Sequence, residues 1–117
     1  MNLRPLLFSL CIALLAPAAS AQKLFVAGEG SLPCSTYLEQ RSKNNNEVNN
    51  LYGAWTRGFL SGFNWVTSVK PMPSIPDTPA TLVYLDKYCR EKPADLLVFA
   101  ADQLGRELGG IYLRKAP

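Results

Sequence analysis

The side chains that most often carry out chemistry in proteins are scarce in this chain of 117 residues. It contains no histidine, which removes the usual general base at neutral pH and the commonest metal ligand. A serine hydrolase needs such a base beside its nucleophile, and a zinc site needs histidine or cysteine ligands. The nine carboxylates could supply the pair that a glycosidase uses, but such side chains are mostly solvated surface residues. We therefore expect a protein that is not an enzyme and has no metal or cofactor.

Three cysteines are the remaining reactive groups. Cys11 lies inside an apolar run, next to Leu10 rather than the small residues that precede a lipidated cysteine. Cys34 and Cys89 are too far apart for the C-x-x-C pattern of a redox pair. Because an exported protein meets an oxidising compartment, we predict that these two form a structural disulfide, which stabilises the fold by about 4 kcal/mol in the chain-entropy model.

The first 21 residues have the pattern of a secretory signal peptide. Arg4 supplies the positive charge, an apolar run extends over 6–15, and Ala19-Ser20-Ala21 places small residues at the cleavage site. The run is too short to cross a hydrocarbon core of ~30 Å. We expect a mature chain of residues 22–117 that forms a single domain, has no membrane span, and is periplasmic or secreted.

The composition indicates a packed globule rather than a disordered chain. Apolar residues make up 48% of the sequence and charged residues only 18%, whereas disorder goes with few apolar and many charged residues. The net charge of +3 is small and its cations are scattered, so no nucleic-acid partner is expected.

Prolines, glycines and asparagines divide the mature chain into four helical segments. We predict helices over 32–43 and 47–69, a third that begins at Thr78 and Pro79, and a fourth that Pro93 opens and Gly109-Gly110 ends. Ser31 and Thr78 are the expected N-caps. A proline-rich loop over 70–77 separates the second helix from the third. The expected fold is all-α: a compact bundle of about four helices with one inter-helix disulfide.

The second segment has the strongest helical pattern. At 100° per residue one apolar arc, which we expect to face the core, contains Leu51, Trp55, Phe59, Gly62, Phe63, Val66 and Val69. Ala54, Gly58 and Gly62 recur at four-residue spacing, which suggests that a neighbouring helix approaches the backbone closely.

Five apolar residues fall off the predicted core faces: Leu60, Trp65, Val83, Val98 and Phe99. Each could also be a core residue, because helical-wheel estimates shift by a residue or two. Together they favour a surface that binds another protein or a second copy of the chain.

The order of features resembles the acid-stress chaperone family typified by HdeA and HdeB. The similar pieces are the segment 34–38 after the first cysteine, the aromatic and glycine-rich segment 55–63, and the segment 77–89 that closes with Tyr88-Cys89. The resemblance implies a small exported helical protein with a disulfide between an early and a late helix. The same plan also looks like that of periplasmic immunity proteins, which neutralise the cell-wall amidase toxins of type VI secretion.

The sequence thus predicts a small exported, non-enzymatic protein-binding domain. An HdeA-like chaperone would bind many clients and respond to acid, whereas an immunity-type inhibitor of a cell-wall hydrolase would bind one toxin at neutral pH. A structural subunit of an envelope assembly is a further alternative. Without histidine, an acid response would have to come from carboxylates titrating near pH 4.

Overall fold

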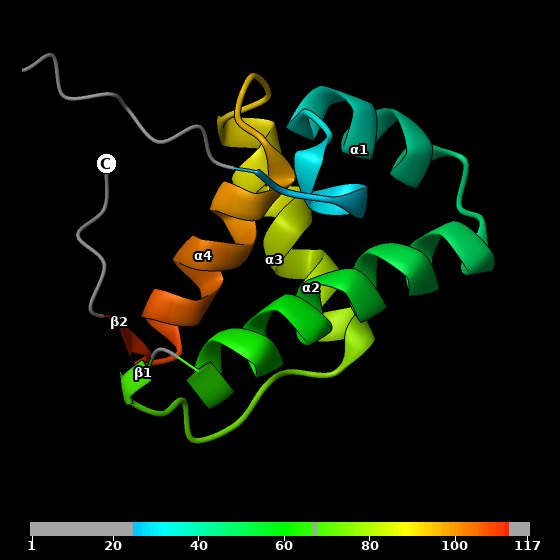
Figure 1. The fold of residues 1–117 in the computed structure, drawn as a ribbon. Coiled ribbons are helices and arrows are strands. Elements are labelled where there is room, and N and C mark those ends of the chain that lie inside the picture. Colours follow the sequence, from blue (N-terminus) through cyan, green and yellow to red (C-terminus); the bar gives the residue numbers. More distant parts are fainter. Residues whose placement is uncertain (1–24, 67, 113–117) are drawn as a thin grey trace, which may run out of the picture.

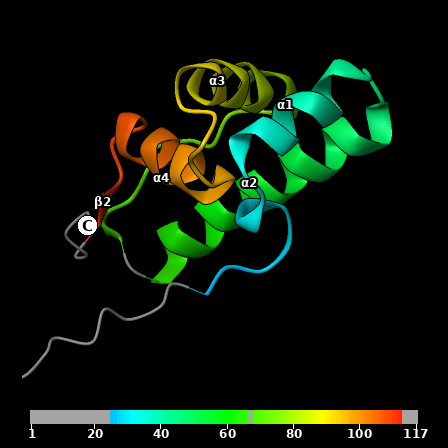
Figure 2. The ribbon, with the colours of Figure 1, turned by 90° about the horizontal axis from the view of Figure 1, so that it is seen from above.

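The computed structural model describes residues 25–66 and 68–112 and confirms the all-α class (Figure 1). In the described part, a 3-10 helix, four α-helices and two very short strands follow one another as η1 (Gly28–Ser31), α1 (Cys34–Ser42), α2 (Asn46–Val66), β1 (Ser68–Lys70), α3 (Thr78–Glu91), α4 (Leu97–Glu107) and β2 (Ile111–Tyr112). Helix α3 contacts each of the other three α-helices. In Figure 2, α3 and α4 both lie on the same side of α2. The predicted signal peptide and Cys11 lie outside the described residues.

The predicted disulfide is confirmed. Cys34 is the first residue of α1 and Cys89 lies near the end of α3, with their Cα atoms 4.9 Å apart and both side chains fully buried. Around the bond lies the larger of two core clusters, whose other buried members are Tyr37, Tyr52, Leu82, Leu85, Leu97 and Ala100.

Helix α1 begins without a side-chain cap. Its N-cap is Pro33, and the amides of Cys34 and Ser35 donate instead to the carbonyl oxygens of Asp95 and Pro93, at 2.7 and 2.9 Å. These amides would otherwise lack partners, as the first amides of any helix do. The loop between α3 and α4 therefore caps α1, beside the disulfide that joins α1 to α3.

Two predicted N-caps are wrong. Ser31 lies in η1, where its hydroxyl donates to the carbonyl oxygen of Gly28 at 2.8 Å. The cap of α3 is Asp77 rather than Thr78, because the Asp77 carboxylate accepts the amide of Ala80 at 2.9 Å. A carboxylate at this position also interacts favourably with the positive end of the helix dipole.

Helix α4 begins at Leu97 rather than at Pro93. Residues 93–95 form a turn, and the Asp95 carboxylate accepts the hydroxyl of Tyr88 at 2.7 Å. The amide of Leu97 donates to the carbonyl oxygen of Leu32 at 2.9 Å, so the chain before α1 in turn supports the start of α4. These backbone bonds link segments that are distant in sequence.

The proline-rich loop covers the second core cluster. Met72 is buried with Leu60 and Leu104, and Ile75 packs against them. The amide of Met72 donates to the Asn64 side-chain oxygen at 2.8 Å, which fixes the loop against the end of α2.

The face of α2 that points into the core differs from the predicted one. Tyr52, Thr56 and Leu60 are fully buried, whereas Leu51 is 51% exposed. Of the predicted core arc, Trp55, Phe59 and Phe63 are half-buried and Gly62 is exposed; the side chains of Val66 and Val69 lie outside the description. The buried face is thus rotated away from the most apolar arc. Tyr52 can lie in the core because its hydroxyl has a hydrogen-bond partner: it donates to the Gln40 side-chain oxygen at 2.6 Å.

Close helix approach occurs at Gly53, not along the 54–58–62 stripe. A Cβ atom at Gly53 would lie 2.4 Å from Cγ2 of Thr78, at the start of α3. A Cβ atom at Gly58 or Gly62 would meet nothing within 4 Å. The helix that was predicted to approach these glycines closely is therefore not found in the described part of the chain.

The apolar tail after α4 forms the second strand. Ile111 pairs with Lys70 and Tyr112 with Ser68, in an antiparallel arrangement. Helix α2 accordingly ends at Val66 rather than at the predicted residue 69. No helix within 25–66 and 68–112 is long and apolar enough to span a membrane.

We expect Cys89→Ser to lower the free energy of unfolding by about 4 kcal/mol, because the bond closes a loop with a sequence separation of 55 residues. Denaturant titration of the oxidised wild type and the variant measures the difference. Cys34→Ser should have the same effect, and the double variant should be no worse than either single one. Unchanged midpoints would contradict a structural role for the bond.

Two glycines in the same helix should respond in opposite ways to alanine. Gly53→Ala should destabilise by roughly 1–3 kcal/mol, because the new methyl group collides with Thr78. Gly58→Ala should stabilise by up to about 1 kcal/mol, since its methyl group enters open space and alanine favours the helix. Denaturant titration at one low protein concentration tests both, and equal effects would show that the packing at Gly53 is misassigned.

Candidate binding surfaces

The structure separates the five predicted surface residues into two groups. Leu60 is fully buried and Val98 is 5% exposed, so the prediction that they lie on the surface is wrong. Leu60 is buried because α2 turns a different face inward. Val98 is buried because α4 contacts η1, α2 and α3 and is thus covered over a wide arc. Trp65, Val83 and Phe99 are exposed, and each lies on a different helix.

Leu51, which the sequence pattern assigned to the core, is exposed on the same side of α2 as Trp65. Leu51 lies on the same helix, and a separation of 14 residues returns to within about 40° of the same direction around a helix. The residues between them in this arc are Ala54, Gly58 and Gly62, all of them exposed. We call Leu51, Ala54, Gly58, Gly62 and Trp65 the open face of α2.

The open face has a flat centre and bulky ends. Gly58 and Gly62 expose backbone with no neighbour within 4 Å of an added Cβ atom. Trp65 is 91% exposed and Leu51 51%. The pair of glycines could have revealed this face, because glycine weakens a helix by about 1 kcal/mol and these two pack against no other residue in the described part of the chain.

A ladder of aromatic rings borders the open face. Trp55 stacks on Phe59 with ring centres 5.5 Å apart, and Phe59 contacts Phe63 at 5.4 Å. The Trp55 ring also covers Gly30 of η1, and its indole N–H donates to the carbonyl oxygen of Ala27 at 3.1 Å. These contacts hold the ladder in place, so the surface next to it is preformed.

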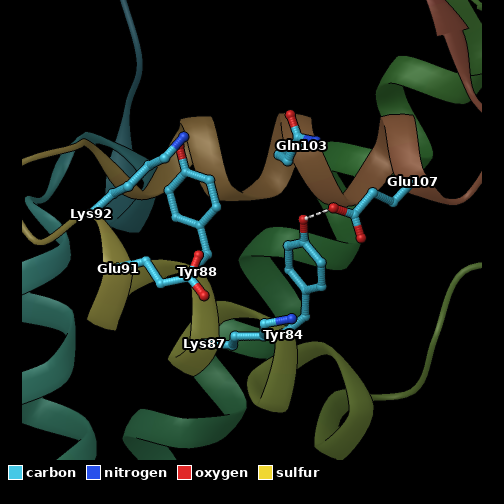
Figure 3. Close-up of a pocket in the computed structure, with 7 residues that line it drawn as sticks. All are labelled: Tyr84, Lys87, Tyr88, Glu91, Lys92, Gln103 and Glu107. Atoms are coloured by element: carbon cyan, nitrogen blue, oxygen red, sulfur yellow. Dashed lines mark hydrogen bonds between the residues drawn. The ribbon is translucent and has the colours of Figure 1, made fainter.

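A second candidate surface is a groove of about 350 Å³ between α3 and α4 (Figure 3). It is lined by Tyr84, Lys87, Tyr88, Glu91, Lys92, Gln103 and Glu107. Figure 3 shows the two tyrosine rings rising from α3 towards α4 and Lys92. The Tyr84 hydroxyl donates to Glu107 at 2.9 Å, and the ammonium group of Lys92 lies 5.1 Å from the centre of the Tyr88 ring.

Polar and charged side chains line the groove. Burial, followed by the hydrogen bond to Glu107, raises the pKa of Tyr84; burial and the hydrogen bond to Asp95 do the same for Tyr88. Both phenols therefore stay protonated, and their protons are directed at carboxylates. Within 25–66 and 68–112, no group of three acidic, cysteine or histidine side chains is placed to hold a metal.

A third site of interest is the Asp86 cluster, which consists of Tyr37, Arg41, Asn49 and Asp86. Arg41 donates to both carboxylate oxygens of Asp86, at 3.0 and 2.8 Å, and Tyr37 donates to the same carboxylate at 2.7 Å. Arg41 also donates to Asn49 at 2.7 Å. The Asp86 carboxylate therefore joins α3 to α1, and the guanidinium group of Arg41 extends the cluster to α2.

The pKa of Asp86 lies below its usual value. Burial alone would raise it, but the hydrogen bonds from Arg41 and Tyr37 and the charges of Arg41 and Arg90 outweigh burial. Folding thus favours the ionised carboxylate. Its stabilisation is complete above the unfolded pKa, near 3.9, and is lost as the pH falls through the lower folded pKa.

We expect Asp86→Asn to lower the free energy of unfolding by roughly 2 kcal/mol at pH 7, because the carboxylate charge that strengthens the hydrogen bonds from Arg41 and Tyr37 is lost. The variant should also lose less stability than the wild type as the pH falls below about 4. Urea titrations at pH 7, 5 and 3 measure both effects. As a matched control, Asp102→Asn removes the charge of a partly exposed pair with Arg106 inside α4 and should change stability by less than about 0.5 kcal/mol. Parallel pH profiles for wild type and Asp86→Asn would refute the assignment.

In comparisons with known proteins, no family model, curated protein or solved structure matches the chain.

Proposed function

We propose that the chain is an exported, non-enzymatic domain that works by binding another protein through the open face of α2. The observation that carries this proposal is the apolar face that residues 25–66 and 68–112 leave uncovered, with Trp65 91% exposed at one end. Tryptophan is among the residues most enriched at the energetic centres of protein interfaces.

The shape of the face supports a protein partner rather than a small ligand. Small-molecule sites are concave and enclose most of their ligand. Here exposed backbone at Gly58 and Gly62 lies between two projecting side chains, Leu51 and Trp65, along one helix. A flat centre between two such projections fits a helix or another extended surface, which contacts both ends at once.

The proposed location is the periplasm or the outside of the cell. The Cys34–Cys89 disulfide is the kind of bond that persists in oxidising compartments and is rare in the cytosol. The leader pattern in the first 21 residues supports the same location.

Of the two kinds of binding protein that the resemblances imply, the open face favours one with a specific partner, as in an immunity-type inhibitor. The face is preformed because the Trp55 ladder beside it is fixed by η1, so binding would need no acid trigger. The acid-stress chaperone is a second candidate because the Asp86 carboxylate, which loses its charge in acid, joins α3 to α1 and holds the arginine that contacts α2.

Site-specific photo-crosslinking in cells that export the protein tests the proposal. A photoreactive phenylalanine analogue replaces Trp65, and in a matched control it replaces Val83, which is exposed on α3 and off the open face. We expect a discrete protein adduct from position 65 at neutral pH and none from position 83. Absence of an adduct at 65, or the same adducts at both positions, would refute the proposal.

The same experiment separates the two candidate functions. A specific partner gives one adduct of fixed mass at neutral pH. An acid-stress chaperone gives adducts of many masses that appear only when the periplasm is acidified far enough to protonate the Asp86 carboxylate, whose pKa lies below its usual value.

A further inference from the structure

We propose that the groove between α3 and α4 binds a linear oligosaccharide of uncharged pyranose rings, with successive rings stacked on Tyr84 and Tyr88. The groove has a volume of about 350 Å³, which is within the range of small-ligand sites. It lies on other helices than the open face of α2, and its ligand is a small molecule rather than a protein. The groove would thus give the chain a second binding activity, beyond the proposed function.

The walls of the groove are built from residues that recur on one face of each helix. On α3, Tyr84 and Tyr88 are four residues apart, and Glu91 follows three residues later. On α4, Gln103 and Glu107 are four residues apart. Side chains at this spacing point the same way and lie one helical turn, roughly 6 Å, from each other. The two tyrosine rings are therefore successive platforms along the groove, at a spacing that suits adjacent rings of a glycan chain.

The tyrosines offer a ligand their ring faces rather than their hydroxyl groups. The Tyr84 hydroxyl donates to Glu107 at 2.9 Å, and the Tyr88 hydroxyl donates to Asp95 at 2.7 Å. These bonds occupy the phenolic protons and hold both rings in place before a ligand arrives. A pyranose ring with equatorial hydroxyl groups has an apolar face of C–H groups, which packs on an aromatic ring as other apolar surfaces do.

The charges around the rings favour an uncharged ligand. Lys87 and Lys92 balance Glu91 and Glu107, so the lining has no net charge. Figure 3 shows Lys92 at one end of the groove and Glu107 at the other, with Gln103 between them. An anion or a cation would be attracted by one pair of these charges and repelled by the other.

The same side chains favour a ligand that is rich in hydroxyl groups. A sugar hydroxyl both donates and accepts, so it can accept from an ammonium group and donate to a carboxylate, and the amide of Gln103 can do either. An apolar ligand would displace water from these groups without replacing its hydrogen bonds. Aromatic faces between alternating donors and acceptors therefore match a carbohydrate.

We expect weak binding, because the charged and amide side chains of the groove are exposed to solvent. Roughly four hydrogen bonds of ordinary net strength correspond to a Kd of about 1 mM. NMR titration of the exported, oxidised protein labelled with ¹⁵N measures affinities of this order at neutral pH. The probes are tri-N-acetylchitotriose and cellotriose, two linear trisaccharides of flat, uncharged rings.

The titration should shift amide signals of residues 84–92 and 103–107 and reach saturation. Glucose should bind several-fold more weakly than cellotriose, because one ring reaches only one tyrosine. A lower Kd for tri-N-acetylchitotriose would assign the site to N-acetylated glycans, such as those of cell walls. Equal or lower Kd values for cellotriose would assign it to neutral β-linked glycans in general.

Variants separate the ring face from the hydroxyl group. Tyr84→Leu should weaken binding by roughly threefold to tenfold, because an aromatic face is lost, whereas Tyr84→Phe keeps the face and should bind within about twofold of the wild type. Gln103→Ala, a change at an exposed position, should weaken binding by about threefold to tenfold. Asn50→Ala removes a matched amide on α2, outside the groove, and should leave Kd unchanged. Circular dichroism melts check that each variant is folded, and Gln103→Ala still tests the site if Tyr84→Leu is not.

Several results would overturn the inference. These are the absence of saturable shifts with both trisaccharides at about ten times the expected Kd, shifts confined to other parts of the chain, or unchanged binding by Tyr84→Leu and Gln103→Ala. Binding of tri-alanine without binding of either sugar would also overturn it, because the charged pairs would then select a zwitterionic peptide. Photo-crosslinking at position 65 probes α2 alone, so the proposed function stands or falls separately.

Discussion

The structure depends above all on the junction between α1 and α3. The Cys34–Cys89 bond lies at its centre, with both sulfur-bearing side chains fully buried. The backbone reinforces it, because the first amides of α1 donate to carbonyl oxygens of the loop that follows α3. At the far end of α1, the Arg41–Asp86 pair joins the same two helices again. A covalent bond, backbone hydrogen bonds and an ion pair thus all stabilise this junction. They matter because a chain of this size buries only a small hydrophobic core.

The junction between α1 and α3 explains why one face of α2 remains exposed. With α1 and α3 held together, α2 packs against them through Tyr52, Gly53 and Leu60, and the loop residue Met72 closes the second cluster. The side of α2 that points away from α3 is left to Leu51, Trp65 and the small residues between them. The proposed interface is therefore a consequence of which face the core uses, and it is rigid because the rings beside it are packed on η1.

The local features of the chain follow from its sequence. The four helices, the breaks between them and the pairing of two distant cysteines could be predicted, because proline, glycine and capping residues act on their near neighbours and two cysteines allow a single bridge. The exposure of Trp65, Val83 and Phe99 could be predicted from the same helical pattern. The start of α1 could not, because its caps are carbonyl oxygens of Asp95 and Pro93, far along the chain.

The choice of the buried face of α2 was decided only by the tertiary structure. Hydropathy favours the arc of Trp55 and Phe59 over that of Tyr52 and Thr56, yet the latter is the one fully buried. Tyr52 finds a partner in Gln40, and Gly53 admits Thr78, so a less apolar face packs more closely. Leu60 and Val98 are buried for the same kind of reason, since neighbours from other helices surround them. Periodicity measures how apolar a face is, whereas burial also depends on which face can approach its neighbours closely.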